Sequence, residues 1–171
     1  MIKTGNEDKL SEILSRLSSL SEKELLSYWI KGEYEEAETY LKLAEKAKKL
    51  GLPEEVVNTF VVLAKESKGH GSRLREIYRR KYGEEPVMVD VPGVEAEILR
   101  QDMKVPEDVV EVLRKAMESE LFAKRLYERL AEETSDDSLR RVYLYLAEIE
   151  RGHYERLRGE LEVCKKIYGK C

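Results

Sequence analysis

Hydrophobic residues recur along this chain with the spacing of an α-helix over four long stretches. In the first stretch Leu25, Trp29 and Tyr40 share a face with Leu43 and Ala47, because residues three, four or seven positions apart lie on the same side of a helix. A shorter amphipathic segment comes before it. The pattern predicts a short helix over Glu7–Ser19, followed by four long helices over about 21–50, 53–82, 107–134 and 136–168.

Capping and turn residues mark the ends of these helices. Ser21 and Glu24 have the spacing of a capping box, in which each side chain accepts a hydrogen bond from the other residue's backbone N–H. Gly51 ends the first long helix, and Pro53 begins the second at a position where its missing N–H costs nothing. Short turns are therefore expected near Gly51 and around Ser135, each joining two antiparallel helices.

A longer connection separates the second long helix from the third. Pro86, Pro92 and Gly93 interrupt the helical pattern there, and Pro106 is expected to begin the third helix. A helix of about 30 residues is ~45 Å long, a distance that this connection spans when it is extended. The chain is therefore predicted to be an all-α four-helix bundle with one long crossover between helices 2 and 3. Residues 1–20 are expected to form an N-terminal extension with the short helix, and residues 21–171 the bundle.

One short phrase occurs twice in the chain. Leu63–His70 reads LAKESKGH and Leu146–His153 reads LAEIERGH, and these two histidines are the only ones among 171 residues. Histidine is the commonest metal ligand in proteins. In each half a Glu also stands seven residues before a Tyr; the pairs are Glu33 with Tyr40 and Glu120 with Tyr127. The repeated unit is therefore a hairpin with a Glu on its first helix and a His on its second.

The two turns lie where they bring the repeated residues to one level. In an antiparallel hairpin, residues equally far from the turn lie at the same height. The midpoint of positions 33 and 67 is 50, beside Gly51, and the midpoint of positions 120 and 150 is 135, at Ser135. The acidic residues and the histidine of each hairpin are therefore expected to lie in one layer.

The side chains of this layer suit a metal ion. Glu150 and His153 project from one face of a helix because they are three residues apart, and Glu120 faces them from the neighbouring helix. The first half contributes Glu33, Glu36 and His70. Several carboxylates inside a bundle cannot all stay ionised without compensation, and bound cations supply it. A mixed set of carboxylate oxygens and imidazole nitrogens favours iron or manganese.

Over roughly residues 21–168 the chain resembles the rubrerythrin branch of the ferritin-like di-iron carboxylate superfamily. The resemblance rests on the Glu, the Tyr seven residues later and the Leu-Ala that follows in both halves, and on the intact Glu-x-x-His at Glu150 and His153. It implies a ferritin-like bundle that binds two irons per chain, with manganese or zinc as alternatives. The implied iron ligands are Glu33, His70, Glu120, Glu150 and His153, and the implied hydrogen-bonding neighbours of the ligands are Tyr40 and Tyr127.

Two positions depart from the family pattern. Ser67 stands where the first Glu-x-x-His would have its Glu, three residues before His70. Glu66 and Glu36 are the candidates to supply the missing carboxylate as metal ligands, with Ser67 beside them. Ala123 stands where rubrerythrins have an additional Glu, three residues after the first. Two outcomes stay open: an asymmetric two-metal site, or a bundle that has lost its iron chemistry.

Two functions of different classes are consistent with these observations. The first is a non-haem di-iron oxidoreductase that reduces peroxide or dioxygen, as in the response to oxidative stress, or that oxidises ferrous iron. No C-x-x-C pair occurs in the sequence, so its electrons are expected from a separate redox protein such as a rubredoxin-like donor. The alternative is a ferritin-like helical scaffold with a degenerate or structural metal site, which acts through protein association. The resemblance also implies a homodimer.

Composition and charge indicate the partners, the source and the location to expect for this protein. Charged residues make up 39% of the chain and the formal net charge is −4, with both signs mixed, so no nucleic-acid partner is expected. Asn and Gln occur only at Asn6, Asn58 and Gln101, and with abundant Lys and Glu this indicates a thermophilic source. The absence of a long apolar run predicts no membrane partner and a cytoplasmic location. Cys164 and Cys171 are expected to be free thiols, because a continuous helix would hold them too far apart for a disulfide; they could pair only if the chain unwinds after Gly169.

Overall fold

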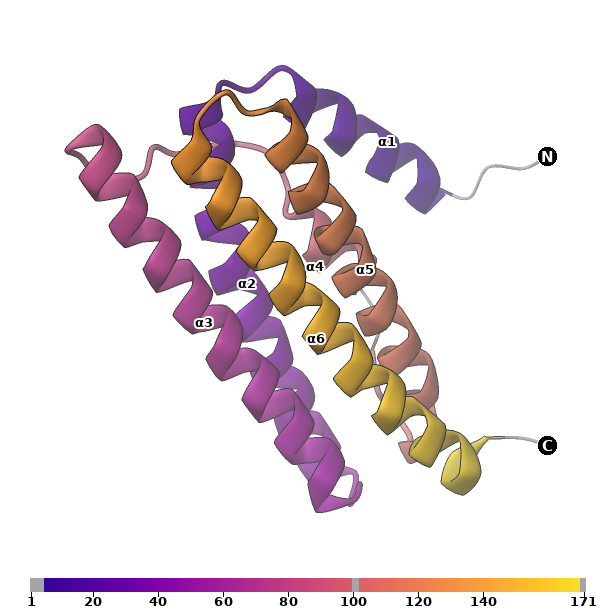
Figure 1. Ribbon diagram of the computed structural model, residues 1–171. Coiled ribbons are helices and arrows are strands. Elements are labelled where there is room, and N and C mark those ends of the chain that lie inside the picture. Colours follow the sequence, from indigo (N-terminus) through magenta and orange to yellow (C-terminus); the bar gives the residue numbers. More distant parts are fainter. Residues whose placement is uncertain (1–4, 100–101, 170–171) are drawn as a thin grey trace. The chain divides into compact units, whose positions relative to one another are not determined.

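The computed structural model describes residues 5–99 and 102–169 of the chain. This part consists of α-helices, one short 3-10 helix and connecting segments, and it contains no strand. Figure 1 labels the α-helices in chain order. Their bounds are α1 Gly5–Ser18, α2 Glu22–Lys49, α3 Glu54–Tyr82, α4 Val94–Ile98, α5 Val109–Glu133 and α6 Asp137–Tyr168, and the 3-10 helix η1 is Pro106–Asp108. The bounds of α1, α2, α3, α5 and α6 lie within two residues of those expected from the hydrophobic pattern.

Contacts among the residues divide the chain into two compact units. The first unit consists of the residues up to Thr39 together with Ala64–Glu97, and the second consists of Tyr40–Leu63 together with the residues from Ile98 onward. The helices α2 and α3 therefore contribute one part to each unit.

The first unit packs the beginning of α2 against the end of α3. The capping box at the start of α2 forms as expected: the Ser21 backbone N–H donates to the Glu24 carboxylate at 3.1 Å, and the Glu24 N–H donates to the Ser21 hydroxyl at 3.2 Å. Trp29 of α2 and Leu74 of α3 are both buried. A Cβ at Gly71 would lie 3.2 Å from the ring of Tyr34, so the absence of a side chain at Gly71 allows α2 and α3 to approach closely.

A tyrosine of α2, Tyr28, helps to tie the connection that follows α3 to this helix. The Tyr28 hydroxyl accepts a hydrogen bond from the Val94 backbone N–H at 2.7 Å and donates one to the Pro92 carbonyl at 2.9 Å. The Tyr28 side chain is buried, and burial raises the pKa of its hydroxyl. Tyr28 therefore fixes the start of α4 through a phenol that stays protonated.

In the second unit, a Schellman motif closes α2 before the turn to α3. The Leu52 N–H donates to the Ala47 carbonyl at 3.0 Å, and the Gly51 N–H donates to the Lys48 carbonyl at 3.2 Å. This motif requires a left-handed residue, and Gly51 supplies it with a φ of 70°. The turn therefore lies where the sequence indicated.

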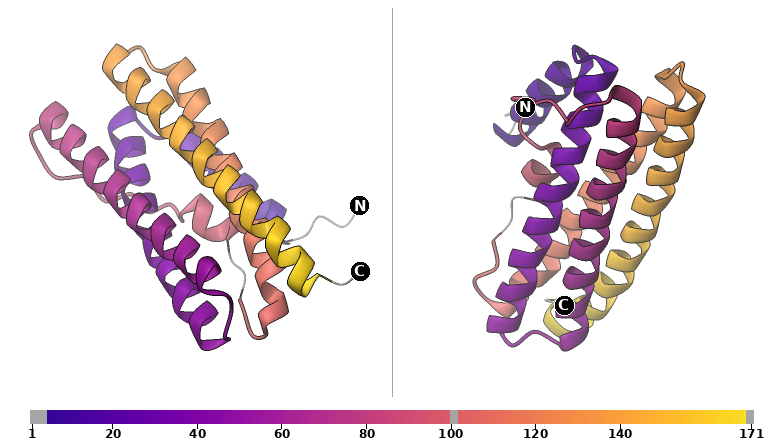
Figure 2. Two further views of the ribbon diagram at one scale, coloured as in Figure 1. Left: turned by 60° about the horizontal axis from the view of Figure 1, so that its bottom comes forward. Right: turned by 90° about the vertical axis from the view of Figure 1, so that its left-hand side faces the viewer.

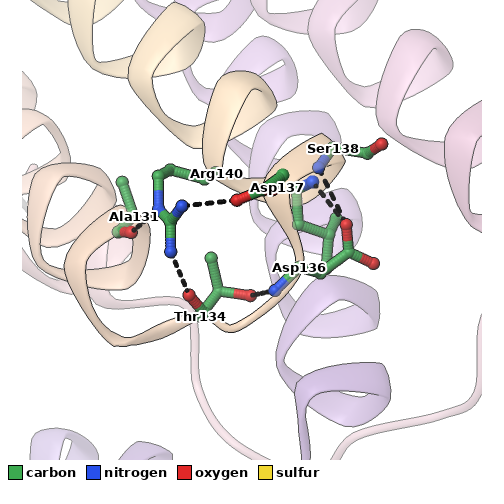
Figure 3. A network of polar contacts seen from close by, with 7 residues as sticks. Ala131, Thr134, Asp136, Asp137, Ser138 and Arg140 are labelled. Atoms are coloured by element: carbon green, nitrogen blue, oxygen red, sulfur yellow. Dashed lines mark hydrogen bonds and ion pairs between the residues drawn. The ribbon is translucent and has the colours of Figure 1, made fainter.

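The helices α5 and α6 of the second unit run antiparallel and side by side, as both views in Figure 2 show in orange and yellow. Asp136 caps α6 by accepting hydrogen bonds from the backbone N–H groups of Ser138 and Leu139 at 2.9 and 3.1 Å. Arg140 reaches back to the last turn of α5, where it donates to the carbonyls of Ala131 and Thr134 at 3.1 and 2.9 Å (Figure 3). The guanidinium thus satisfies carbonyls that a helix end leaves without intrahelical partners.

Pro106 does not begin an α-helix, in contrast to the expectation from sequence. Pro106–Asp108 form the 3-10 helix η1, and α5 begins at Val109. The Asp108 carboxylate caps the start of this 3-10 helix, because it accepts hydrogen bonds from the backbone N–H groups of Lys104 and Val105 at 2.7 and 3.1 Å. These bonds fold the chain into a tight turn ahead of the helix.

No helix in the described ranges combines the length with the apolar character that crossing a bilayer requires. Cys164 is buried and is a free thiol, which agrees with the expectation for that residue. Cys171 lies outside the described residues.

Candidate metal centre

Two carboxylates and one imidazole form a buried cluster between α5 and α6. Glu120 comes from α5, whereas Glu150 and His153 come from α6, and each of the three is at most 3% exposed. The Nδ1 atom of His153 lies 3.4 Å from Oε2 of Glu120 and 3.3 Å from Oε2 of Glu150. One ligand atom of each residue lies within 4.8 Å of the others. The structure thus brings together the three residues that the second repeat contributed to the expected layer.

The local sequence explains why these side chains meet. Glu150 and His153 are three residues apart on α6, so they project from the same face of the helix. The turn between α5 and α6 lies midway between Glu120 and Glu150 in the sequence, which places both residues at one height in an antiparallel pair. Small or apolar residues one turn away, such as Ala123 and Leu146, are buried as well. The cluster therefore lies in the interior of the second unit.

Tyr40 completes this cluster from the second half of α2. Its hydroxyl donates a hydrogen bond to Oε1 of Glu120. Burial by itself raises the pKa of Glu120, but the polar contacts of Glu120 with Glu150, His153 and Tyr40 and the field of His153 outweigh it, so the pKa lies below its usual value. Glu120 is therefore an anion at neutral pH, the form in which a carboxylate binds a metal ion.

The first unit contains a second set of polar side chains. They form two pairs, each joining a residue of α2 to a residue of α3. Nδ1 of His70 lies 3.5 Å from Oε2 of Glu33. One turn away, the Ser67 hydroxyl donates a hydrogen bond to Oε2 of Glu36 at 2.9 Å. Glu33, Glu36 and Ser67 are buried, and the side chain of His70 is 13% exposed. Ser67 on α3 thus stands where a carboxylate is missing, and the buried carboxylate of Glu36 on α2 lies beside it.

The remaining candidates lie in different surroundings. Glu66 is partly exposed, whereas the neighbouring Ser67 is fully buried. Tyr127 is fully buried, and its ring stacks on that of Tyr143 with 6.3 Å between the centroids. The sequence left Glu66 and Glu36 as candidates for the missing carboxylate. Their burial differs, because Glu36 is buried whereas Glu66 is partly exposed. The equal spacing of Glu33 to Glu36 and of Ser67 to His70 is the signal in the sequence for the contact between Glu36 and Ser67.

The donors of the Glu120 cluster fit a metal ion. Two ligand atoms at about 2.1 Å from a common ion are about 3.0–3.4 Å apart at octahedral or tetrahedral angles. The separations of 3.3 and 3.4 Å from the His153 nitrogen to the two carboxylates agree with this spacing. Carboxylate oxygens with an imidazole nitrogen suit iron, manganese or zinc. A cation would also offset the negative charge of buried carboxylates.

The described part of this protein is helical and contains a buried cluster of carboxylates and histidine. These features place it in the class of helical proteins that can hold a metal ion. The sequence matches the family model for Rubrerythrin over residues 24–161. The chain therefore belongs to the rubrerythrin family and has the ferritin-like helical bundle fold, as the repeated phrase predicted.

A solved structure supports the fold independently. A hypothetical protein from Pyrococcus furiosus is similar to this chain, with a TM-score of 0.72 and 31% sequence identity. The similarity covers 87% of this chain and 93% of that protein. No curated protein sequence matches the chain.

Proposed function

We propose that this chain is a di-iron carboxylate oxidoreductase, which reduces peroxide or dioxygen or oxidises ferrous iron. Membership of the rubrerythrin family supports the proposal. The single observation that carries it is the buried group of Glu120, Glu150 and His153, whose ligand atoms approach one another closely enough to share an ion. Two irons when bound supply the two electrons that cleave an O–O bond without releasing a radical.

Each half of the chain supplies ligands in this proposal. Glu120, Glu150 and His153 bind metal in the second unit, and Glu33 with His70 binds it in the first. Tyr40 orients Glu120, because its hydroxyl donates to one carboxylate oxygen and leaves the other directed to His153. A ligand held in this way by a hydrogen bond is already positioned before metal binds.

The surroundings of Glu120 keep water away from the ligands. Ala116 and Ala123 flank it one turn away on α5, and Leu146 and Leu157 flank the ligands of α6; all four are buried. In such surroundings the field of a carboxylate acts on a bound cation with little screening. The apolar residues thus strengthen binding and protect the reacting centre from solvent.

The proposed electron source is a separate redox protein, such as a rubredoxin-like donor. The two cysteines of the chain are seven positions apart, a spacing that does not form the paired C-x-x-C ligands of an iron–sulfur centre. The proposal also includes a homodimer, a cytoplasmic location and a thermophilic source, in line with the resemblance and the composition described above.

Metal content tests the proposed function directly. Protein prepared in iron-replete medium is expected to hold about two irons per chain and to consume peroxide in the presence of a surrogate electron donor. Iron at 100 times its dissociation constant is expected to stabilise the apo chain by about 2.7 kcal/mol for each site that it fills.

Variants of α6 provide the matched comparison. His153→Ala and Glu150→Gln are expected to lose the stabilisation by metal, whereas Glu155→Gln, an exposed carboxylate on the same helix, keeps it. A wild-type chain that retains no metal and gains no stability from it contradicts the proposal and favours the helical scaffold that acts through protein association.

A further inference from the structure

Met88 is the most exposed large apolar residue that the structure describes. It is 97% exposed, whereas Met103 is 5% exposed and Met117 is partly exposed. Met1 lies outside the described residues. The thioether of methionine is a group that oxidants attack, so the methionines of this chain differ chiefly in how easily a small oxidant reaches the sulfur.

The segment that presents Met88 is held in place on both sides. On one side, the Val87 backbone N–H donates a hydrogen bond to the Ser27 hydroxyl at 3.1 Å. On the other side Val89 is buried, and the Asp90 carbonyl accepts a hydrogen bond from the Arg16 guanidinium. Met88 is therefore exposed while the backbone around it is anchored, and its sulfur is accessible without any unfolding.

Met88 also lines a surface hollow of about 440 Å³ within the first unit. Ile30 and Tyr34 of α2 and the segment 86–89 form much of the lining. The apolar part of this lining includes the side chain of Met88. A sulfoxide is polar where a thioether is apolar, so oxidation of Met88 changes the surface of the hollow and leaves the buried residues unchanged.

We propose that Met88 is a reversible modification site, at which hydrogen peroxide converts the thioether to a sulfoxide while the chain stays folded. One peroxide oxygen bonds to the sulfur as the O–O bond breaks, and the other leaves as water with both protons. The sulfur is oxidised and the peroxide is reduced. The reaction needs no metal, so the inference does not rest on the proposed function.

Exposure decides which methionine reacts first. The exposed fractions of Met88 and Met103 have a ratio of about 20, so Met88 is expected to be oxidised about 20-fold faster. The products differ as well. A sulfoxide at Met88 stays in water, whereas one at Met103 places a polar group in the interior, which costs free energy.

Treatment of the full chain with dilute hydrogen peroxide tests the assignment. Mass spectrometry of the peptides follows the oxygen added at each methionine. All the methionines meet the same peroxide in one sample, so the ratio of their rates does not depend on how much peroxide the chain consumes. Met88→Leu keeps an apolar side chain and is the matched control. It is expected to gain no oxygen at position 88 and to leave the rates at Met103 and Met117 unchanged.

Stability and repair test whether the modification belongs to the folded chain. With Met88 alone oxidised, the urea midpoint is expected to equal that of the untreated chain. Methionine sulfoxide reductases for the two sulfoxide epimers are expected to restore the thioether without denaturant.

The outcomes are distinct from those of the proposed function. Oxidation of Met103 as fast as Met88 overturns the inference, and so does a lower urea midpoint with Met88 alone oxidised. A sulfoxide at Met88 that the reductases reduce only after unfolding also overturns it. A chain that holds no iron contradicts the proposed function and leaves the role of Met88 in place.

Discussion

Tyr40 and Tyr78 provide a test of how the buried polar groups contribute to stability. Both side chains are 0% exposed. The Tyr40 hydroxyl donates a hydrogen bond to the Glu120 carboxylate, whereas the Tyr78 hydroxyl has no hydrogen-bond partner among the described residues. Replacing either tyrosine by phenylalanine removes only the hydroxyl, so the two variants differ in the hydrogen bond and little else.

Tyr40→Phe is expected to destabilise the apo chain, because it leaves a buried anion with one donor fewer. A hydrogen bond to a charged group contributes about 1.5–3 kcal/mol. The ring of Tyr40 stacks on Phe60 with 6.2 Å between the centroids, and this contact survives in the variant. Tyr78→Phe is expected to be neutral or stabilising by about 1 kcal/mol, since it removes a buried hydroxyl without a partner.

Urea denaturation followed by circular dichroism measures both effects. With an m-value of about 2 kcal/mol/M, the midpoint of Tyr40→Phe is expected to fall by about 1 M and that of Tyr78→Phe to stay or rise. The chelator-treated chain is used throughout, so that metal affinity does not contribute. Equal midpoints for the two variants, or a wild-type midpoint for Tyr40→Phe, would refute the argument that the Glu120 hydrogen bond stabilises the fold.

Two further predictions concern the turn between α5 and α6 and the buried thiol. Arg140→Ala is expected to lower the stability by about 1 kcal/mol, because the last carbonyls of α5 lose their donor (Figure 3), and the exposed Arg141→Ala is the control that should show no loss. Burial raises the pKa of Cys164 from 9.0 to about 11. In a Cys171→Ser background, the folded chain should therefore resist iodoacetamide at pH 8. Its stability should also fall as the pH rises above the pKa of the unfolded thiol, since only the folded state then keeps the proton. Rapid alkylation of the native chain at pH 8 would contradict the placement of Cys164.

The helical fold could be predicted from the sequence because its signals are local. The capping box of Ser21 and Glu24, the left-handed Gly51 and the 3.6-residue pattern each act within a few residues of the chain. The prediction was wrong at Pro106, where the Asp108 side chain turns back to the preceding backbone. The bond from the Val105 N–H to Asp108 has the form of a capping-box contact at the start of the 3-10 turn, and a hydrophobic pattern does not register such a contact.

The sequence by itself determined the repeat, the family and the residue types that can bind a metal. Only the tertiary structure decided which acidic side chain lies beside Ser67. Glu66 and Ser67 are neighbours in sequence, but successive residues point about 100° apart around a helix, so Glu66 is partly exposed while Ser67 is buried. Glu36 lies on another helix and reaches Ser67 through the packing of α2 against α3. A contact between helices depends on their rotation and register, which are properties of the packed fold rather than of either segment.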